Sequence, residues 1–250
     1  TVKDTLSLHD ALPILLGLIF RGVAFEFRWR TRRNKGVWDL SFAGGSIVAT
    51  LAQGIALGAL VQGIEVEGRA YAGGWWDWLT PFSVMTGLAL VSGYALLGAT
   101  WLVMKTEGDL QARARELAWR TGLATLALIG VVSVATPFLE PVYLERWLAW
   151  PGAIFSFLVP ALVAGCALLL FRGLSAGADR QPFLAAIGLF VLCFAGLGIS
   201  FYPYIVPPAL TIEAAAAPDS SLVFLLVGAA ILLPLILGYT AYAYWVFRGK

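Results

Sequence analysis

The sequence predicts an all-α fold, a polytopic transmembrane helical bundle of about seven membrane helices. Three observations support this prediction. First, the 250 residues are 60% hydrophobic and 13% charged, with a mean hydropathy of +0.82, whereas a soluble domain is roughly 45–50% apolar and about 25% charged. Second, the apolar residues form long continuous runs. Third, the basic residues collect in alternate connections between these runs, which is typical of a chain that crosses a membrane repeatedly.

The first 13 residues differ in character from the rest. TVKDTLSLHDALP begins polar and charged and lacks the long apolar region of a signal peptide. We interpret residues 1–13 as a non-native leader and residues 14–250 as the membrane domain. His9, the only histidine, lies in this leader. The remaining residues therefore offer no imidazole for a haem, a metal ion or general-base chemistry.

Seven apolar runs are long enough to cross about 30 Å of hydrocarbon at ~1.5 Å per residue. Because these runs are continuous rather than alternating, they favour helices over strands. The expected helices cover residues 12–27, 40–62, 80–104, 120–139, 148–171, 182–202 and 221–247.

Two helix starts carry recognisable signals. In WLTP, residues 78–81, the proline stands near the first turn of the third helix, where a helix has no partner for an N–H. Asp39 precedes the second run, and we interpret it as a helix cap that also suits the helix dipole. Small residues predict close helix packing, most clearly the GxxxG of Gly54 and Gly58. The further close-approach positions are Gly44, Gly45, Gly87, Gly93, Gly98, Gly196 and Gly198.

Basic residues predict the orientation of the helices, because cytoplasmic connections carry an excess of Lys and Arg. The connections at 28–36, 105–120 and 172–180 hold five, four and two basic residues, and the C-terminal tail holds two. One side thus collects 13 basic residues, against Arg69 and Arg146 on the other. We therefore expect a cytoplasmic C-terminus. Tryptophans before the third and fifth runs fit an aromatic belt on the outer side.

Several function classes find no support in the sequence. It contains no P-loop, Rossmann glycine pattern, nucleophile elbow or CxxC pair. Cys166 and Cys193 lie within apolar runs, so we interpret them as packed small side chains. The net charge of +2 gives no reason to expect a nucleic acid partner. The helix centres hold Ser, Thr, Gly and Gln53 but no acid or base, which argues against ion-coupled transport.

Five segments carry a resemblance to a known family. They are RGVAFEFR (21–28), WDLSFAGGS (38–46), WWDWLTPFSVMTGLALVSGYALLGATWLVMKTEG (75–108), SFYPYIVPPALTIEAAAAPDSSL (200–222) and the ending LILGYTAYAYWVFRGK. Together they resemble subunit II of cytochrome bd-type quinol oxidases, closest to the cyanide-insensitive branch. The resemblance covers essentially the whole chain after residue 14. It implies that the family's N-terminal helices are missing from this chain.

The resemblance implies a non-haem subunit of a quinol:oxygen oxidoreductase, in the inner membrane of bacteria. The expected partner is a homologous subunit I, which carries haem b, haem d and the quinol site. Quinol and dioxygen are the substrates of the complex, and subunit II contributes to cytoplasmic proton uptake for the reduction of dioxygen to water. Small accessory subunits, and a structural quinone or lipid in this subunit, are left open. The alternative functions are a polytopic membrane scaffold and a small-solute transporter.

Two charges arrive before the first apolar run ends at Phe27. Arg21 matches an arginine of the family and Glu26 matches an acidic position. The resemblance implies that Glu26 is a proton-path residue near the cytoplasm, with Arg21 as a deeper charge that tunes it. A charge at the centre of the hydrocarbon costs ~2.5–3.5 kcal/mol, so such residues tend to face protein or water.

A structural interpretation of these two charges stays open. Glu26 is close enough to the end of the run to reach the interface, and Arg21 can snorkel. Their five-residue spacing turns about 140° around a helix, so they do not automatically pair. Glu26 and Arg30, four residues apart, are the more natural pair. The basic residues that follow are expected to set topology and to contact anionic lipid; they are Arg28, Arg30, Arg32 and Arg33.

Overall fold

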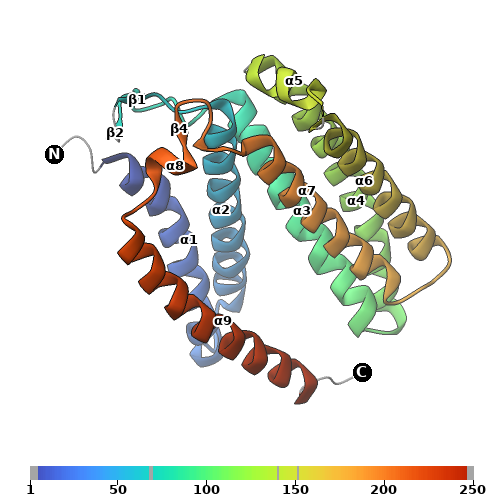
Figure 1. The fold of residues 1–250 in the computed structure, drawn as a ribbon. Coiled ribbons are helices and arrows are strands. Elements are labelled where there is room, and N and C mark those ends of the chain that lie inside the picture. Colours follow the sequence, from blue (N-terminus) through green and yellow to red (C-terminus); the bar gives the residue numbers. More distant parts are fainter. Residues whose placement is uncertain (1–4, 68–69, 140, 151, 247–250) are drawn as a thin grey trace. The chain divides into compact units, whose positions relative to one another are not determined.

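A computed structural model describes residues 5–67, 70–139, 141–150 and 152–246, and these residues are largely helical (Figure 1). The predicted all-α class is confirmed. The seven long helices among the described residues are α1 (Thr5–Arg30), α2 (Lys35–Gln62), α3 (Pro81–Lys105), α4 (Gly108–Leu139), α6 (Gly152–Ser175), α7 (Gln181–Phe201) and α9 (Asp219–Val246). The short helices are α5 (Pro141–Leu148) and α8 (Ile212–Ala215).

All seven predicted apolar runs lie within or largely within these long helices. By length and composition, six of the described helices can cross a membrane, namely α2, α3, α4, α6, α7 and α9. The first predicted run lies within α1, which also includes Arg21 and Glu26. α4 begins at Gly108, twelve residues before its apolar run, because its charged first turns are helical as well.

Two short antiparallel hairpins lie in the connections. β1 (Val66–Glu67) pairs with β2 (Ala70–Tyr71), and β3 (Tyr204–Val206) pairs with β4 (Leu210–Thr211). The hairpins follow the ends of α2 and α7. Neither was predicted from the sequence, because the connecting segments carry no run long enough to show an alternating pattern.

The chain divides into a larger unit that ends at Thr211 and a smaller unit that begins at Ile212. In the larger unit, each of the helices α1 to α4 packs on the next, α6 packs on α7, and α7 packs on α3. The core lies among α3, α4, α6 and α7, where small side chains allow the helices to approach closely. Its buried residues are Leu96, Ala99, Ala118, Leu170, Leu174, Ala185, Ala186 and Leu189.

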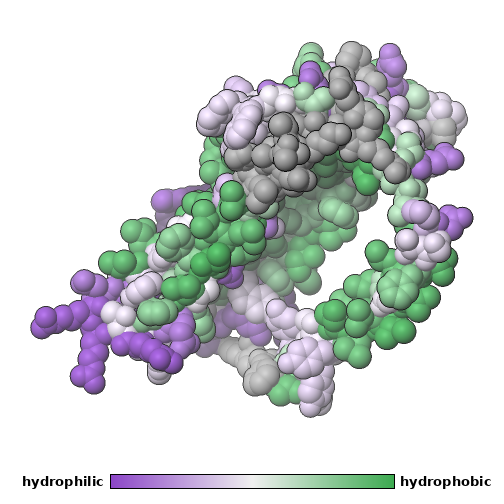
Figure 2. All heavy atoms as spheres, turned by 90° about the vertical axis from the view of Figure 1, so that its left-hand side faces the viewer, coloured by the Kyte–Doolittle hydropathy of each residue, from purple (hydrophilic) through white to green (hydrophobic). Residues whose placement is uncertain are grey.

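The two ends of the larger unit differ in chemistry. At one end, here named the basic end, the turns 31–34, 106–107 and 176–180 connect the helices. At the other, here named the hairpin end, lie β1–β2, α5 and β3–β4 (Figure 1). On the face drawn in Figure 2, hydrophobic residues cover much of the helix surface, and strongly hydrophilic residues lie mainly at the lower left and along the top. This distribution fits helices that cross an apolar layer.

The predicted GxxxG lies where α2 crosses α3. A Cβ atom on Gly54 would stand 2.5 Å from the Cα atom of Gly87, and one on Gly58 would stand 2.6 Å from the Cα atom of Ser83. These distances are too short for any side chain, so the close approach requires glycine. The same prediction is confirmed for Gly45, Gly87 and Gly93. Gly44, Gly98 and Gly198 meet no described atom within 4 Å, so they serve no close approach among the described residues.

The start of α3 has the predicted form. Pro81 is its first residue and Thr80 its N-cap. The Thr80 hydroxyl accepts the Ser83 N–H at 3.1 Å, and the Thr80 N–H donates to the Ser83 hydroxyl at 2.9 Å. This reciprocal pair is a capping box.

The smaller unit contains α8 and α9. α9 is apolar around its whole circumference and buries none of its residues within the unit. A helix of this kind suits an apolar environment, either lipid or another membrane protein.

Candidate functional site

The predicted site residues lie where α1 turns into α2, at the basic end. The turn is held by an aromatic pair and a hydrogen bond. The rings of Phe27 and Trp38 stack with 5.3 Å between their centroids, and the Trp38 indole N–H donates to the Thr31 hydroxyl at 3.0 Å. Asn34 caps α2 with φ 63°, a left-handed conformation that asparagine tolerates better than most residues.

Asp39 is therefore not the helix cap that the sequence suggested. α2 begins at Lys35, one turn earlier than expected, because its polar first residues are helical too. Asp39 instead accepts hydrogen bonds from the Arg28 guanidinium, through Nε and through Nη2 at 3.3 Å. This hydrogen bond and the carboxylate charge raise the pKa of Arg28 above its ordinary value. The ion pair joins the last turn of α1 to the first turns of α2.

Glu26 pairs with the residue expected from its spacing. Its Oε1 atom lies 2.9 Å from Nη2 of Arg30, one turn further along α1. Both side chains are largely exposed, Glu26 at 63% and Arg30 at 77%. The structure thus places the Glu26 carboxylate within reach of solvent at the basic end.

Arg21 and Glu26 are not brought together. The Arg21 guanidinium lies over the ring of Phe42 on α2, 5.3 Å from its centroid, which is a cation–π contact. Among the described residues, Arg21 forms no ion pair. Arg32 and Arg33 are exposed in the turn between the helices, where they are free to meet lipid headgroups or water.

Sequence reasoning missed a second polar contact at the basic end, because residues 105–120 were counted as a connection. Arg115, on α4, is only 20% exposed. Its guanidinium donates to the carbonyls of Leu174, Gly177 and Ala178 at 3.2 to 3.3 Å, and lies 3.5 Å from Asp179. Arg115 therefore satisfies the last carbonyls of α6 and the turn that follows.

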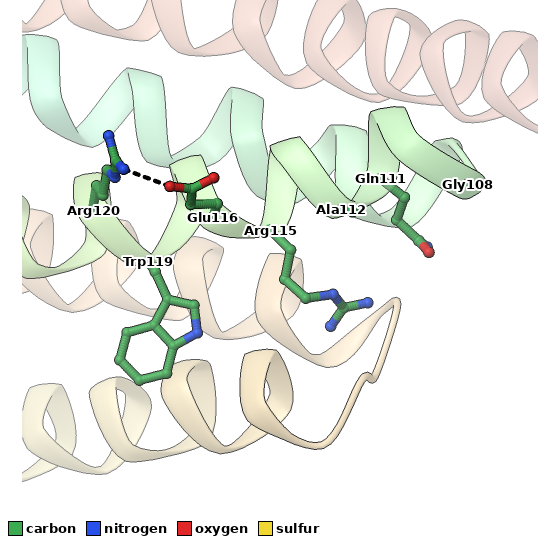
Figure 3. A pocket seen from close by; sticks show the side chains of 7 residues that line it. All are labelled: Gly108, Gln111, Ala112, Arg115, Glu116, Trp119 and Arg120. Carbon is green, nitrogen blue, oxygen red and sulfur yellow. Dashed lines mark hydrogen bonds and ion pairs between the residues drawn. The ribbon is translucent and has the colours of Figure 1, made fainter.

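A surface pocket of about 680 Å³ runs along the start of α4 (Figure 3). Glu116 and Arg120 form an ion pair beside it, and Trp119 points toward α6, where its ring meets Phe171 at 4.6 Å. Glu116 is 63% exposed and Arg120 is 76% exposed. This pair therefore matches Glu26 and Arg30 in spacing, exposure and end of the molecule.

The described residues do not fit a metal centre. Among them, no three His, Cys, Asp or Glu side chains lie close enough to hold an ion. The two cysteines are not joined to each other, and Cys166 and Cys193 lie on different helices, α6 and α7. The charged side chains at the basic end of the described residues therefore form ion pairs and hydrogen bonds and no cluster of metal ligands.

Comparison with known proteins identifies the family. Residues 9–247 match the family described as cytochrome bd terminal oxidase subunit II. The chain belongs to this family. Subunit 2 of the cytochrome bd-I ubiquinol oxidase of Escherichia coli K12 is 30% identical over 275 residues, covering 95% of the chain and 72% of the relative. Subunit 2 of the cytochrome bd ubiquinol oxidase of Bacillus subtilis is 27% identical, covering 95% and 71%.

The fold has a counterpart of known structure. The bd oxidase from Geobacillus thermodenitrificans matches with a TM-score of 0.72 and 20% identity, over 98% of this chain and 75% of that chain. Together with the family match, this confirms the resemblance to subunit II of cytochrome bd-type oxidases. Family and apolar helices together show a multi-pass bacterial membrane protein and a subunit of an oxidoreductase complex.

Proposed function

We propose that this chain is the non-haem subunit of a membrane quinol:oxygen oxidoreductase and takes part in cytoplasmic proton uptake. The observation that carries the proposal is the family match over residues 9–247. Relatives that share this match are named as ubiquinol oxidase subunits in both E. coli and B. subtilis. The partner is subunit I, which carries haem b and haem d, and the substrates of the complex are quinol and dioxygen.

The residues of the chain support this division of labour. The only histidine is His9, so residues 10–250 offer no imidazole for a haem iron. Haem in the partner supplies the electron transfer and the oxygen chemistry. The chain itself supplies apolar helices that pack within the membrane and charged side chains at the basic end. Its contribution to the reaction is therefore structural support and the handling of protons.

The basic end faces the cytoplasm in this proposal. The turns at this end and the C-terminal tail hold most of the basic residues, and the opposite connections hold only Arg69 and Arg146. Positive charge is retained on the cytoplasmic side of bacterial membranes. The hairpin end then lies at the outer surface, and the C-terminus is cytoplasmic.

Glu26 is the proton-uptake group of this proposal. In this proposal its carboxylate lies on the side that supplies protons for water formation. It is exposed to solvent, and among the described residues its ion-pair partner is the exposed Arg30. Such a group can take a proton from bulk water and release it toward the protein. Arg21 lies five residues before Glu26 in α1, over Phe42, and is the deeper positive charge of this proposal.

Replacing Glu26 with alanine tests the role directly, and the chain offers a matched control. We expect Glu26→Ala to slow quinol-driven oxygen consumption several-fold in the intact complex, with unchanged haem absorption. Glu26→Asp should keep part of the rate, because it keeps a carboxylate. Glu116→Ala removes an equally exposed carboxylate paired in the same way, and should leave turnover at the wild-type rate.

The outcome against the proposal is equally definite. If Glu26→Ala turns over at the wild-type rate across the whole pH range, with normal assembly, Glu26 is an interfacial residue and the chain acts as a scaffold. If Glu26→Ala and Glu116→Ala slow turnover equally, the effect comes from surface charge and not from a specific proton path.

A further inference from the structure

A cleft of about 520 Å³ opens at the hairpin end, where α5, α6 and α7 meet. Arg146 and Trp147 line it from α5, Ser156 from α6, and Ala195 and Gly198 from α7. Tyr202, directly after α7, also lines it. Its volume is in the range of small-ligand sites, about 300–1,000 Å³.

Arg146 gives the cleft a positive charge. Its Nη1 atom donates to the carbonyls of Ser200 at 3.1 Å and Phe201 at 3.4 Å, and its guanidinium lies 5.0 Å from the ring centroid of Tyr204. A guanidinium carries five N–H donors, so these contacts leave donors for another partner. No carboxylate of the described residues forms an ion pair with Arg146. A half-buried guanidinium that has no carboxylate partner is stabilised by an anion.

The floor of the cleft is apolar and open. An ideal Cβ atom on Gly198 meets no described atom within 4 Å, so the space beside α7 is unfilled at this position. Ala195 and Ile199 of α7 add apolar surface to the lining, and α6 and α7 also expose large apolar side chains, including Phe155 and Phe194. The Trp147 indole N–H donates to the Ser200 hydroxyl at 3.1 Å, which fixes an aromatic residue beside the charge. Amphipathic aromatic residues of this kind mark the membrane–water interface.

We propose that this cleft binds a phospholipid, with its phosphate on the Arg146 guanidinium and an acyl chain along Ala195 and Gly198. Charge and shape together select this ligand. A soluble phosphate satisfies the arginine but leaves the apolar floor uncovered, whereas a quinone covers the floor but brings no negative charge. The proposal needs only that the hairpin end lies at a membrane surface, and it is independent of any role for Glu26.

The bound lipid would tie together three elements that are distant in sequence. Arg146 already joins α5 to the last carbonyls of α7 and to the β3–β4 hairpin. A phosphate on the same guanidinium adds a charge-assisted contact at this junction, and the acyl chain covers the gap between α6 and α7. The lipid is thus expected to be retained when the complex is extracted from the membrane.

Native mass spectrometry of the purified complex tests the proposal, followed by rebinding of phosphatidylglycerol after delipidation. We expect the wild-type complex to retain a phospholipid. Arg146→Gln and Gly198→Leu should each weaken phosphatidylglycerol binding about tenfold, as expected for the loss of a charge-assisted hydrogen bond or of a well-filled apolar surface. Arg120→Gln, which removes an exposed arginine at the basic end, should bind as the wild type does.

Gly198→Leu keeps the test decisive if Arg146→Gln does not fold. The leucine side chain enters open space and leucine favours a helix more than glycine does, so this variant should assemble while its cleft is filled. The proposal is overturned if Gly198→Leu binds phosphatidylglycerol like the wild type. It is also overturned if inorganic phosphate displaces the lipid at equal concentration, or if the retained molecule has the mass of a quinone.

Discussion

Arg115 and Arg28 lie at the same end of the larger unit, yet their surroundings differ. Arg28 is at the surface and pairs with the exposed Asp39, and ion pairs of this kind contribute little to stability. Arg115 is mostly buried and donates to three carbonyls at the end of α6 and in the following turn. Buried carbonyls that lose a charged donor are costly. The two arginines were indistinguishable in the sequence, where both counted only as cytoplasmic charges.

We expect Arg115→Gln to lower the free energy of unfolding by about 1.5–3 kcal/mol, the range for hydrogen bonds to charged groups. Arg28→Gln is the control at the same end and should leave the unfolding midpoint nearly unchanged. Thermal unfolding of the purified protein in detergent measures both. Equal midpoints for the two variants would show that the α4–α6 junction does not depend on Arg115.

The sequence predicts well those features whose position follows from apolar runs, capping residues or small residues. The apolar runs, the α3 start at Thr80 and the crossing at Gly54 and Gly58 follow from hydrophobic length, capping chemistry and small residues. Besides the two short hairpins, the parts that were missed are polar starts of helices. α4 extends three turns before its apolar run, and α2 begins before Asp39, because a helix satisfies its own backbone hydrogen bonds outside the membrane too.

The same reasoning limits what could be predicted of the candidate site. The spacing of Glu26 and Arg30 indicated their pair, since both stand on one helix face. The Arg28–Asp39 pair and the Arg146 cleft join different helices. Such contacts depend on how the helices pack, and hydrophobic periodicity carries no information about that.

The crossing of α2 and α3 yields a prediction at the scale of elements. Gly58→Leu places a side chain where the Cα atom of Ser83 stands 2.6 Å from an ideal Cβ, so the helices must separate. We expect loss of most folded protein from the membrane, measured as the amount recovered by mild detergent and gel filtration. Gly98→Leu meets open space on α3 and should be recovered like the wild type. Equal recovery of both variants would contradict the close crossing.

At the scale of the whole molecule, the distribution of charge predicts how the chain crosses the membrane. A fluorescent protein that matures only in the cytoplasm should be bright when fused after Lys250. The same reporter inserted after Ala217, between α8 and α9, should stay dark, because α9 crosses the membrane after that point. The reverse pattern would invert the orientation, and it would place Glu26 on the wrong side for cytoplasmic proton uptake.

Membership of an oxidase complex explains why one helix of the chain has a fully apolar surface. α9 presents apolar side chains on every face. This fits a subunit whose helices lie in lipid or against another membrane protein.

The most direct measurement is purification of this chain from bacterial membranes through a tag at its C-terminus, with the visible spectrum and quinol-driven oxygen consumption recorded on the product. We predict that a second, haem-bearing subunit co-purifies with the chain, and that the complex consumes oxygen when quinol is supplied. A chain that purifies without haem and without oxidase activity, from cells that also produce an intact subunit I, would contradict the account.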